Sequence, residues 1–289
     1  MNKKASIIVV AGPTASGKSD FAVDLALRHN GEIISADSRQ VYKGLDIGTG
    51  KITHDEMKGI PHYMLSVYEP GEDVSVARYA HDALPIIEDI LARGKTPIIC
   101  GGTGQYIDAL MYDTALPKVE PNKKLREELE DLSTEVLVAR LMACDKNRAA
   151  SIDPHNRVRL IRALEIVDAI GKVPEQDTPK LRYPTTFYIM KSSRESSRAR
   201  ITKRLERRLE IGMIDEVKEL MKQGYTSENM KTFGLEYVTI GKYLEGKLTD
   251  QEMRMELINK SMQYVKRQET WNKKYTRDSA LTLIPVPVE

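Results

Sequence analysis

A phosphate-binding loop is the first stretch of the chain whose residue types point to chemistry. Residues 12–19 read GPTASGKS and fit the pattern GxxxxGK[ST], between an apolar run at residues 6–11 and a helical periodicity of apolar side chains. Small residues let consecutive backbone N–H groups surround an anion, and the N-terminus of the following helix adds positive charge. Lys18 is expected to neutralise phosphate charge, and Ser19 to ligate Mg²⁺. The predicted phosphate-binding residues are Gly12, Pro13, Thr14, Ala15, Ser16, Gly17, Lys18 and Ser19.

A carboxylate, Asp37, stands in an unusual place for a protein with such a loop. Nucleotide hydrolases hold Mg²⁺ with an acid at the end of a later strand, but here the run at 96–100 continues into GGTG. Asp37 follows the apolar run at 32–36 instead. Because parallel strands end at one crevice, we expect the phosphate loop, Asp37 and Thr103 to share a site. Capping of a turn is the alternative role for Asp37, since Asp-Ser is good capping chemistry.

The elements that position these residues alternate between buried strands and helices. Strands are predicted at residues 6–11, 32–36, 96–100 and 185–190, and an amphipathic helix at 76–93. This alternation predicts an α/β fold with a P-loop-type parallel sheet core flanked by helices and right-handed crossovers.

A helical insertion interrupts this core. Residues 122–171 carry helical periodicity without a strand signal, and proline-bearing stretches lie on both sides. We therefore predict a first core part at 1–113, an all-helical insertion domain at 114–184 and a second core part at 185–289. The second part is expected to end in basic helices.

Composition sets broad limits on the function. With 289 residues, 41% hydrophobic and 30% charged, the chain is neither disordered, collagen-like nor a disulfide mini-scaffold, and two domains are expected. Its two cysteines lie far apart, and no apolar run reaches the length of a signal-peptide core or a bilayer span. A cytoplasmic monomer without a membrane partner is expected.

Positive charge is concentrated in the C-terminal half, although the net charge is only +2. Residues 194–208 carry seven basic and two acidic side chains, and residues 260–277 carry six basic and one acidic. Such basic stretches favour a polyphosphate or nucleic-acid partner.

Three further strings closely resemble those of the tRNA dimethylallyltransferases, also called tRNA isopentenyltransferases. They follow the phosphate loop in family order, as DSRQVYKGLDIGT at 37–49, GGTGQY at 101–106 and KRQETW at 266–271. Shorter matches are NRVRLIRALE at 156–165 and RITKR at 200–204. The likeness extends from the first strand to about residue 274, and as a set these motifs are specific.

The resemblance implies transfer of a dimethylallyl group from dimethylallyl diphosphate to N6 of the adenosine 3′-adjacent to the anticodon in tRNA, with release of diphosphate. A diphosphate leaving group explains the absent hydrolase acid, because no γ-phosphate needs an attacking water. The adenine amine is a weak nucleophile, so a carboxylate must accept its proton, and Asp37 supplies one.

The resemblance also implies a set of site residues and partners. The implied partners are dimethylallyl diphosphate and the tRNA anticodon stem-loop, with Mg²⁺ as cofactor, held by Ser19 through the diphosphate. The implied catalytic residues are Asp37, Lys18, Thr103 and Arg204. The implied tRNA-binding residues are Asp37, Ser38, Arg39, Gln40, Thr103, Arg157, Arg159, Arg162, Lys266, Arg267, Gln268, Trp271 and Lys273.

Two other classes of function remain open from the residues alone. A P-loop small-molecule or nucleotide kinase with a helical lid accounts for the phosphate loop and Arg204, but not for a basic, tryptophan-bearing C-terminal helix. A non-catalytic RNA-binding module accounts for that helix, but leaves Lys18, Ser19 and Asp37 unexplained together.

Overall fold

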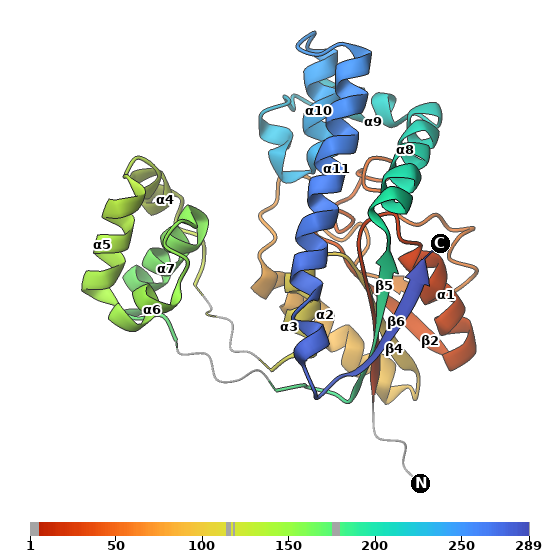
Figure 1. Ribbon diagram of the computed structural model, residues 1–289, viewed down its shortest axis with the longest axis horizontal. Coiled ribbons are helices and arrows are strands. Elements are labelled where there is room, and N and C mark those ends of the chain that lie inside the picture. The colour runs from red at the N-terminus through yellow and green to blue at the C-terminus, as the bar shows by residue number, and fades with distance from the viewer. Residues whose placement is uncertain (1–5, 114–116, 118, 175–179, 289) are drawn as a thin grey trace. The chain divides into compact units, whose positions relative to one another are not determined.

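The computed structural model describes residues 6–113, 117, 119–174 and 180–288, and it divides into two compact units. One unit comprises Met1–Tyr112 and Leu181–Glu289, and the other is Asp113–Lys180 (Figure 1). Among the predicted domain boundaries, residues 1, 114 and 289 lie outside the described ranges.

The described residues of the first unit form one six-stranded, all-parallel sheet in the order β3-β2-β4-β1-β5-β6. The predicted α/β fold with a parallel sheet is therefore confirmed. The strands are β1 (Ile7–Ala11), β2 (Gly31–Ala36), β3 (His62–Tyr63), β4 (Thr96–Gly101), β5 (Thr185–Ser192) and β6 (Thr282–Val288).

Helices cover both faces of this sheet, which is why the inner strand β1 is apolar along its whole length. Every residue of β1 is buried, as expected for a strand covered on two sides. The helix α1 (Lys18–His29) packs on β1, β2 and β4, and Figure 1 shows it on one side of the sheet. On the other side lie α2 (Val76–Ala92) and α3 (Gly104–Met111).

The two edge strands were not predicted from the sequence. The strand β3 has only two residues, and β6 contains Pro285 and Pro287, which weaken any strand pattern. Proline is tolerated in β6 because an edge strand needs backbone hydrogen bonds on one side only, toward β5. Their positions at the edges of the sheet thus explain why neither strand was predicted.

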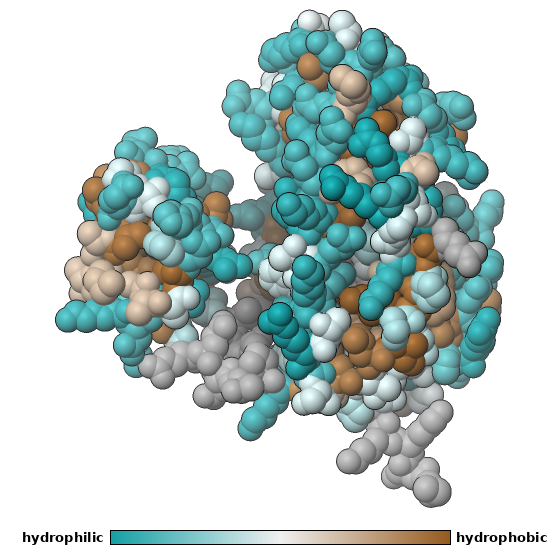
Figure 2. Space-filling model, viewed as in Figure 1, coloured by the Kyte–Doolittle hydropathy of each residue, from teal (hydrophilic) through white to brown (hydrophobic). Residues whose placement is uncertain are grey.

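Four helices lie wholly or in part beyond the carboxyl ends of the strands and form the roof of the site, and the longest also runs down beside the sheet to contact α3 (Figure 1). The last of them has a capping box, in which Thr249 and Glu252 satisfy each other's backbone N–H groups. Figure 2 shows that the viewed face of this region is mostly hydrophilic. Among the described helices, none is both long and apolar enough to cross a membrane. The four are α8 (Arg194–Glu210), α9 (Met213–Lys222), α10 (Leu235–Leu244) and α11 (Asp250–Asn272).

The second unit consists of helices in the part that the structure describes. Their core gathers leucines such as Leu137, Leu141 and Leu160, all with no exposed surface. A buried carboxylate, Glu165, pairs with Arg126 at 2.9 Å and with Arg162, so its charge is compensated. The helices are α4 (Lys123–Glu130), α5 (Thr134–Cys144), α6 (Lys146–Ser151) and α7 (Arg157–Ile170).

Candidate active site

The phosphate loop connects β1 to α1 and has the form of an anion cradle. Ala15 has a φ of +59°, in the left-handed region that non-glycine residues rarely adopt. The Ser16 hydroxyl is buried without a hydrogen-bond partner in the described residues. Strain and an unsatisfied buried polar atom cluster where a ligand completes the structure. The loop is therefore suited to a phosphate.

Two buried cations face this loop without enough counter-charge. Burial lowers the pKa of Lys18 to about 8, and the Lys18 ammonium donates to the Pro13 carbonyl at 2.6 Å. Burial, together with the neighbouring Arg208, also lowers the pKa of Arg204. Removing cations from water costs free energy that a bound anion would offset. The site thus favours a polyanion on electrostatic grounds.

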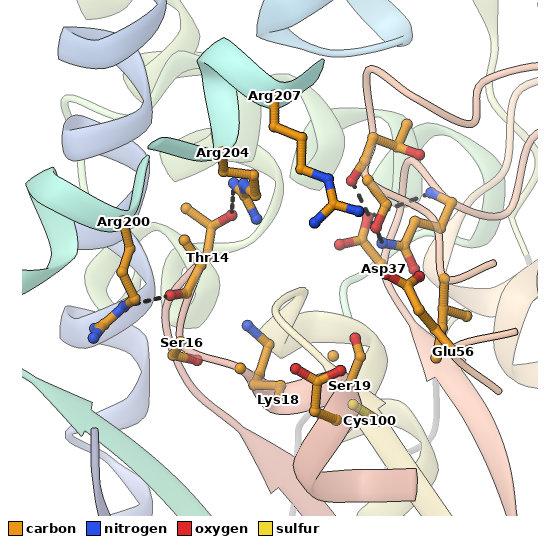
Figure 3. A pocket seen from close by; sticks show the side chains of 18 of the residues that line it. Thr14, Ser16, Lys18, Ser19, Asp37, Glu56, Cys100, Arg200, Arg204 and Arg207 are labelled. Carbon is orange, nitrogen blue, oxygen red and sulfur yellow. Dashed lines mark hydrogen bonds between the residues drawn. The ribbon is translucent and has the colours of Figure 1, made fainter. Parts of the chain in front are cut away.

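One face of α8 supplies most of this positive charge. Arg200, Lys203, Arg204 and Arg207 all line the same cavity as the phosphate loop, at spacings of three and four residues. Arg200 donates to the Ala15 carbonyl at 2.8 Å, and Arg204 donates to the Thr14 hydroxyl at 2.6 Å. Figure 3 shows the three labelled arginines projecting from the helix toward the loop. Sequence reasoning identified only Arg204, although the spacing was a usable signal for the other three.

Asp37 lies where it was predicted, directly after β2 and across the cavity from the phosphate loop (Figure 3). One carboxylate oxygen, Oδ1, accepts from the backbone N–H groups of Arg39 at 2.9 Å and Gln40 at 3.4 Å. In the described structure the other oxygen, Oδ2, accepts no hydrogen bond from the protein. The turn-capping hydrogen bonds therefore use one oxygen of the carboxylate and leave the other for the predicted proton transfer.

Thr103 supports the loop that carries Asp37. Its hydroxyl oxygen accepts from the Ser38 backbone N–H at 2.9 Å and donates to the Ser38 hydroxyl at 3.3 Å. Thr103 is not among the residues that line the two large cavities described next. Its observed contacts are those of a positioning residue.

Two cavities meet at Asp37. The first, of about 540 Å³, contains the phosphate loop and the α8 cations. The second, of about 420 Å³, is lined by Ser38, Arg39 and residues of α10 and α11, including Tyr264. Thr14, Asp37, Thr49 and Arg204 line both. Two ligands could therefore approach each other beside the Asp37 carboxylate. Tyr264 lies outside the matched motifs and was missed.

Gln268, one of the predicted RNA-contacting residues, makes its hydrogen bonds within the protein. Its side chain is buried, and its amide oxygen accepts from the Thr14 backbone N–H at 2.8 Å while its amide nitrogen donates to the Gly102 carbonyl at 3.1 Å. Both ends are thus occupied in tying the phosphate loop to the turn after β4. A glutamine amide can contact RNA, but the Gln268 side chain lies on the face of α11 that packs against the core.

The other predicted residues of the C-terminal helix lie at its surface. Lys266 and Arg267 are exposed and, with Thr270, Trp271 and Lys274, line a shallow hollow. The Lys274 ammonium lies 4.3 Å from the centre of the Trp271 ring. Lys273 is exposed beside the hollow. Cationic side chains around a partly exposed aromatic ring are typical of single-stranded RNA contacts.

The three predicted arginines of α7 differ in their surroundings. Arg157 donates to the Thr134 hydroxyl and the Glu130 carbonyl, at 3.1 and 3.0 Å. Arg162 pairs with buried Glu165 and donates to the Val119 carbonyl. Arg159 is exposed, and its guanidinium makes no hydrogen bond to the described residues. Arg162 serves the core of the insertion, so of the three Arg159 is best placed to reach a ligand.

Oxygen donors in the first cavity fit a magnesium ion that is bound mainly through a substrate. Ser19, Asp20, Asp37 and Glu56 all line this cavity, and oxygen is the ligand that Mg²⁺ prefers. No group of three or more His, Cys, Asp or Glu side chains in the described residues is arranged to hold a metal by itself. This donor set suits Mg²⁺ that keeps several waters and phosphate ligands.

Comparisons with known proteins agree on one family. The IPP transferase family model matches residues 40–275. The chain is 39% identical to the tRNA dimethylallyltransferase of Exiguobacterium sp. (strain ATCC BAA-1283 / AT1b), covering 93% of this chain and 88% of the relative. It is 41% identical to that of Anoxybacillus flavithermus (strain DSM 21510 / WK1), covering 92% and 86%.

Solved structures give the same answer at the level of the fold. The full-length tRNA isopentenylpyrophosphate transferase from Bacillus halodurans superposes with a TM-score of 0.71 at 35% identity, covering 99% of this chain and 91% of that one. A eukaryotic dimethylallyltransferase acting on tRNA gives 0.84 at 30% identity, covering 97% and 74%. The sequence motifs, the site and these matches together show that this chain belongs to the IPP transferase family, the tRNA dimethylallyltransferases.

Proposed function

We propose that this chain transfers a dimethylallyl group from dimethylallyl diphosphate to N6 of the adenosine 3′-adjacent to the anticodon in tRNA. The observation that carries the proposal is the meeting of two cavities at Asp37. The phosphate loop and the α8 cations suit a diphosphate in the first cavity. The second cavity suits an extruded purine, with Tyr264 and Arg39 in its wall.

In the transfer, the adenine N6 lone pair attacks C1 of the dimethylallyl group while the C1–O bond to the diphosphate breaks. Asp37 Oδ2 accepts the proton that N6 releases, so the product is a neutral secondary amine. Lys18 and Arg204 stabilise the charge that develops on the leaving oxygen. Backbone N–H groups of the phosphate loop share that charge. The electron pair of the broken bond leaves with the diphosphate.

Magnesium would be held by Ser19 and by diphosphate oxygens. Its contribution when bound is further neutralisation of the leaving group. Asp37 then remains available for proton transfer through Oδ2, because its two backbone hydrogen bonds use only Oδ1.

The tRNA must present its base outside the stacked anticodon loop, which costs a few kcal/mol. Contacts elsewhere offset this cost. Lys266, Arg267 and Trp271 on α11 suit the loop nucleotides, and Arg159 on the insertion suits a stem phosphate. We propose that the insertion acts as a lobe that holds the stem-loop.

The proposal is tested with an anticodon stem-loop RNA and labelled dimethylallyl diphosphate. Label should enter RNA that carries adenosine at the target position, and nucleoside mass analysis should place one dimethylallyl group on that base. RNA with purine riboside there, which lacks the exocyclic amine, is the control and should accept no label. Equal labelling of both RNAs would refute attack by N6.

The kinase alternative is separated by incubating the protein with γ-labelled ATP and the same RNA. Neither phosphate transfer nor RNA-dependent ATP hydrolysis is expected, because the strand β4 ends without a carboxylate. Robust turnover of ATP, together with no prenyl transfer, would favour the kinase.

A further inference from the structure

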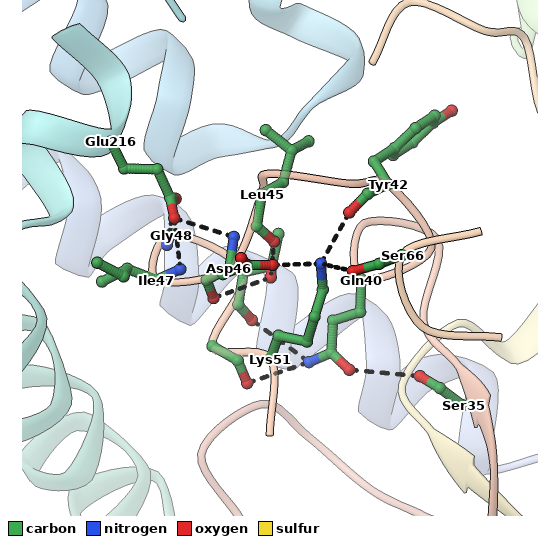
Figure 4. Close-up of polar contacts among 12 residues, drawn as sticks. Ser35, Gln40, Tyr42, Leu45, Asp46, Ile47, Gly48, Lys51, Ser66 and Glu216 are labelled. Atoms are coloured by element: carbon green, nitrogen blue, oxygen red, sulfur yellow. Dashed lines mark hydrogen bonds and ion pairs between the residues drawn. The ribbon is translucent and has the colours of Figure 1, made fainter. Parts of the chain in front are cut away.

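A loop at residues 46–51 forms a wall of the site, and the reaction chemistry assigns it no role. Its Thr49 lines both cavities at their junction, and Gly50 lines the first. The loop contains no helix or strand, so its shape depends on what holds it. Figure 4 shows side chains converging on it from several elements.

Glu216 of α9 holds the beginning of the loop through three consecutive backbone N–H groups. Its Oε2 accepts from Asp46 at 3.0 Å and Ile47 at 2.7 Å, and its Oε1 accepts from Gly48 at 2.9 Å. The Tyr237 hydroxyl also donates to Oε1, at 2.7 Å. Successive N–H groups of this kind form a nest that commonly binds a phosphate, and here a side-chain carboxylate fills it. Four charge-assisted hydrogen bonds on one carboxylate make a strong anchor.

The packing around the anchor leaves the loop little freedom. A Cβ on Gly48 would lie 2.6 Å from the Tyr237 ring, and one on Gly50 would lie 1.6 Å from Arg208 Nη2. Gly50 also has a φ of +63°, which favours glycine. Arg208 is buried and donates to the Gly48 carbonyl at 3.1 Å. The loop is therefore clamped on both sides.

The C-terminal end of the loop holds the Gln40 side chain through hydrogen bonds. The Gln40 amide nitrogen donates to the carbonyls of Gly50 at 3.2 Å and Thr49 at 3.5 Å, and its oxygen accepts from the Ser35 hydroxyl at 3.3 Å. The Gln40 backbone N–H in turn donates to Asp37 Oδ1. Hydrogen bonds at its two ends and the backbone between them thus connect Glu216, through the loop and Gln40, to the proposed general base.

We propose that Glu216 is a positioning residue for prenyl transfer, which acts by holding the 46–51 loop so that Thr49 stays at the junction of the cavities and Gln40 keeps the Asp37 carboxylate in place. The inference rests on the proposed function, because it takes Asp37 as the group that accepts the N6 proton. Glu216 lines neither cavity, so it acts through the loop and touches no substrate.

The test is Glu216→Gln, which keeps the size of the side chain but replaces one acceptor oxygen with a donor amide. The matched control is Glu219→Gln on the same helix, where the exposed carboxylate pairs with Lys222 at 3.0 Å. Single-turnover prenyl transfer in Glu216→Gln should fall about 10- to 100-fold, the scale of an alignment error near 1 Å. Affinity for dimethylallyl diphosphate should stay within about twofold, because the phosphate loop does not contact Glu216. Glu219→Gln should match the wild type.

A double-mutant cycle with Gln40→Ala distinguishes positioning from general loss of structure. If Glu216 acts through Gln40, the double variant should be no slower than the slower single variant, whereas independent effects would multiply. If Glu216→Gln fails to fold, Tyr237→Phe removes one hydrogen bond from the same carboxylate and should slow transfer about threefold or more.

The proposal is overturned if folded Glu216→Gln transfers at the wild-type rate, if the two effects multiply, or if the loss lies entirely in donor affinity. Measuring the wild type in parallel distinguishes failure of the Glu216 proposal from failure of the proposed function. Absence of prenyl transfer by the wild type would refute the function, whereas transfer by both proteins at equal rates would refute only the role of Glu216.

Discussion

At the scale of single residues, the site is defined by charges that the fold leaves incompletely balanced. Lys18 and Arg204 are buried beside a phosphate loop that contains a strained Ala15 and an unpartnered Ser16 hydroxyl. Each feature costs free energy in the free protein. A bound diphosphate would remove these costs together, so binding and catalysis depend on the same few atoms.

The lowered pKa of Lys18 predicts how donor binding depends on pH. Burial brings this pKa to about 8 in the free protein, and a bound diphosphate should raise it. Affinity for dimethylallyl diphosphate should therefore fall as the ammonium deprotonates above pH 8. Isothermal titration calorimetry across pH 6.5–9.5, about one and a half pH units on either side of this pKa, measures the donor affinity.

Lys18→Arg is the control for this prediction, because a guanidinium keeps its proton to a higher pH than an ammonium in the same surroundings. The fall should then move to higher pH, even if affinity is lower overall. An unchanged inflection in Lys18→Arg would show that another group titrates.

At the scale of elements, α11 does more than present basic side chains to RNA. Gln268 on its buried face ties the phosphate loop to the turn after β4. Gln268→Ala should raise the KM for dimethylallyl diphosphate about tenfold, because a Thr14 N–H loses its partner and the loop loosens. The KM for tRNA should change little. Steady-state kinetics with each substrate varied in turn tests this.

Glu269→Gln is the matched control for Gln268→Ala, since Glu269 is its exposed neighbour on the same helix. It should leave the donor KM unchanged. A rise in the tRNA KM alone in Gln268→Ala would instead support the sequence-based prediction that Gln268 contacts RNA.

The insertion helix α7 carries two arginines with different expected effects. Arg159→Ala should weaken stem-loop binding and reduce the log–log salt slope by about one unit, without changing the melting temperature. Arg162→Ala should instead lower stability by about 1–2 kcal/mol, because Glu165 loses one of its two cations. Filter binding over a salt series and thermal unfolding measure the two. An unaltered slope in Arg159→Ala would remove the insertion from the proposed stem-loop contact.

At the scale of the whole molecule, the sequence predicted those features that depend on residues close together in the chain. The central strands were predictable from their apolar runs, and the phosphate loop and Asp37 from their positions directly after strands. The contacts that Gln268 and Arg162 make within the protein were not, because motif membership does not reveal which turn of a helix faces the core. Glu216 lies about 170 residues from the loop that it anchors, so only the fold reveals the contact.

The central claim is that Asp37, at the junction of two cavities, accepts the proton of the attacking amine. Its most direct test is single-turnover prenyl transfer by Asp37→Asn, with donor and stem-loop affinities measured on the same protein and Glu219→Gln, an exposed carboxylate outside both cavities, as the control. The account predicts affinities within about threefold of wild type, a rate at least about 10²-fold lower, and a near-normal control. A rate for Asp37→Asn within a few-fold of wild type would contradict it.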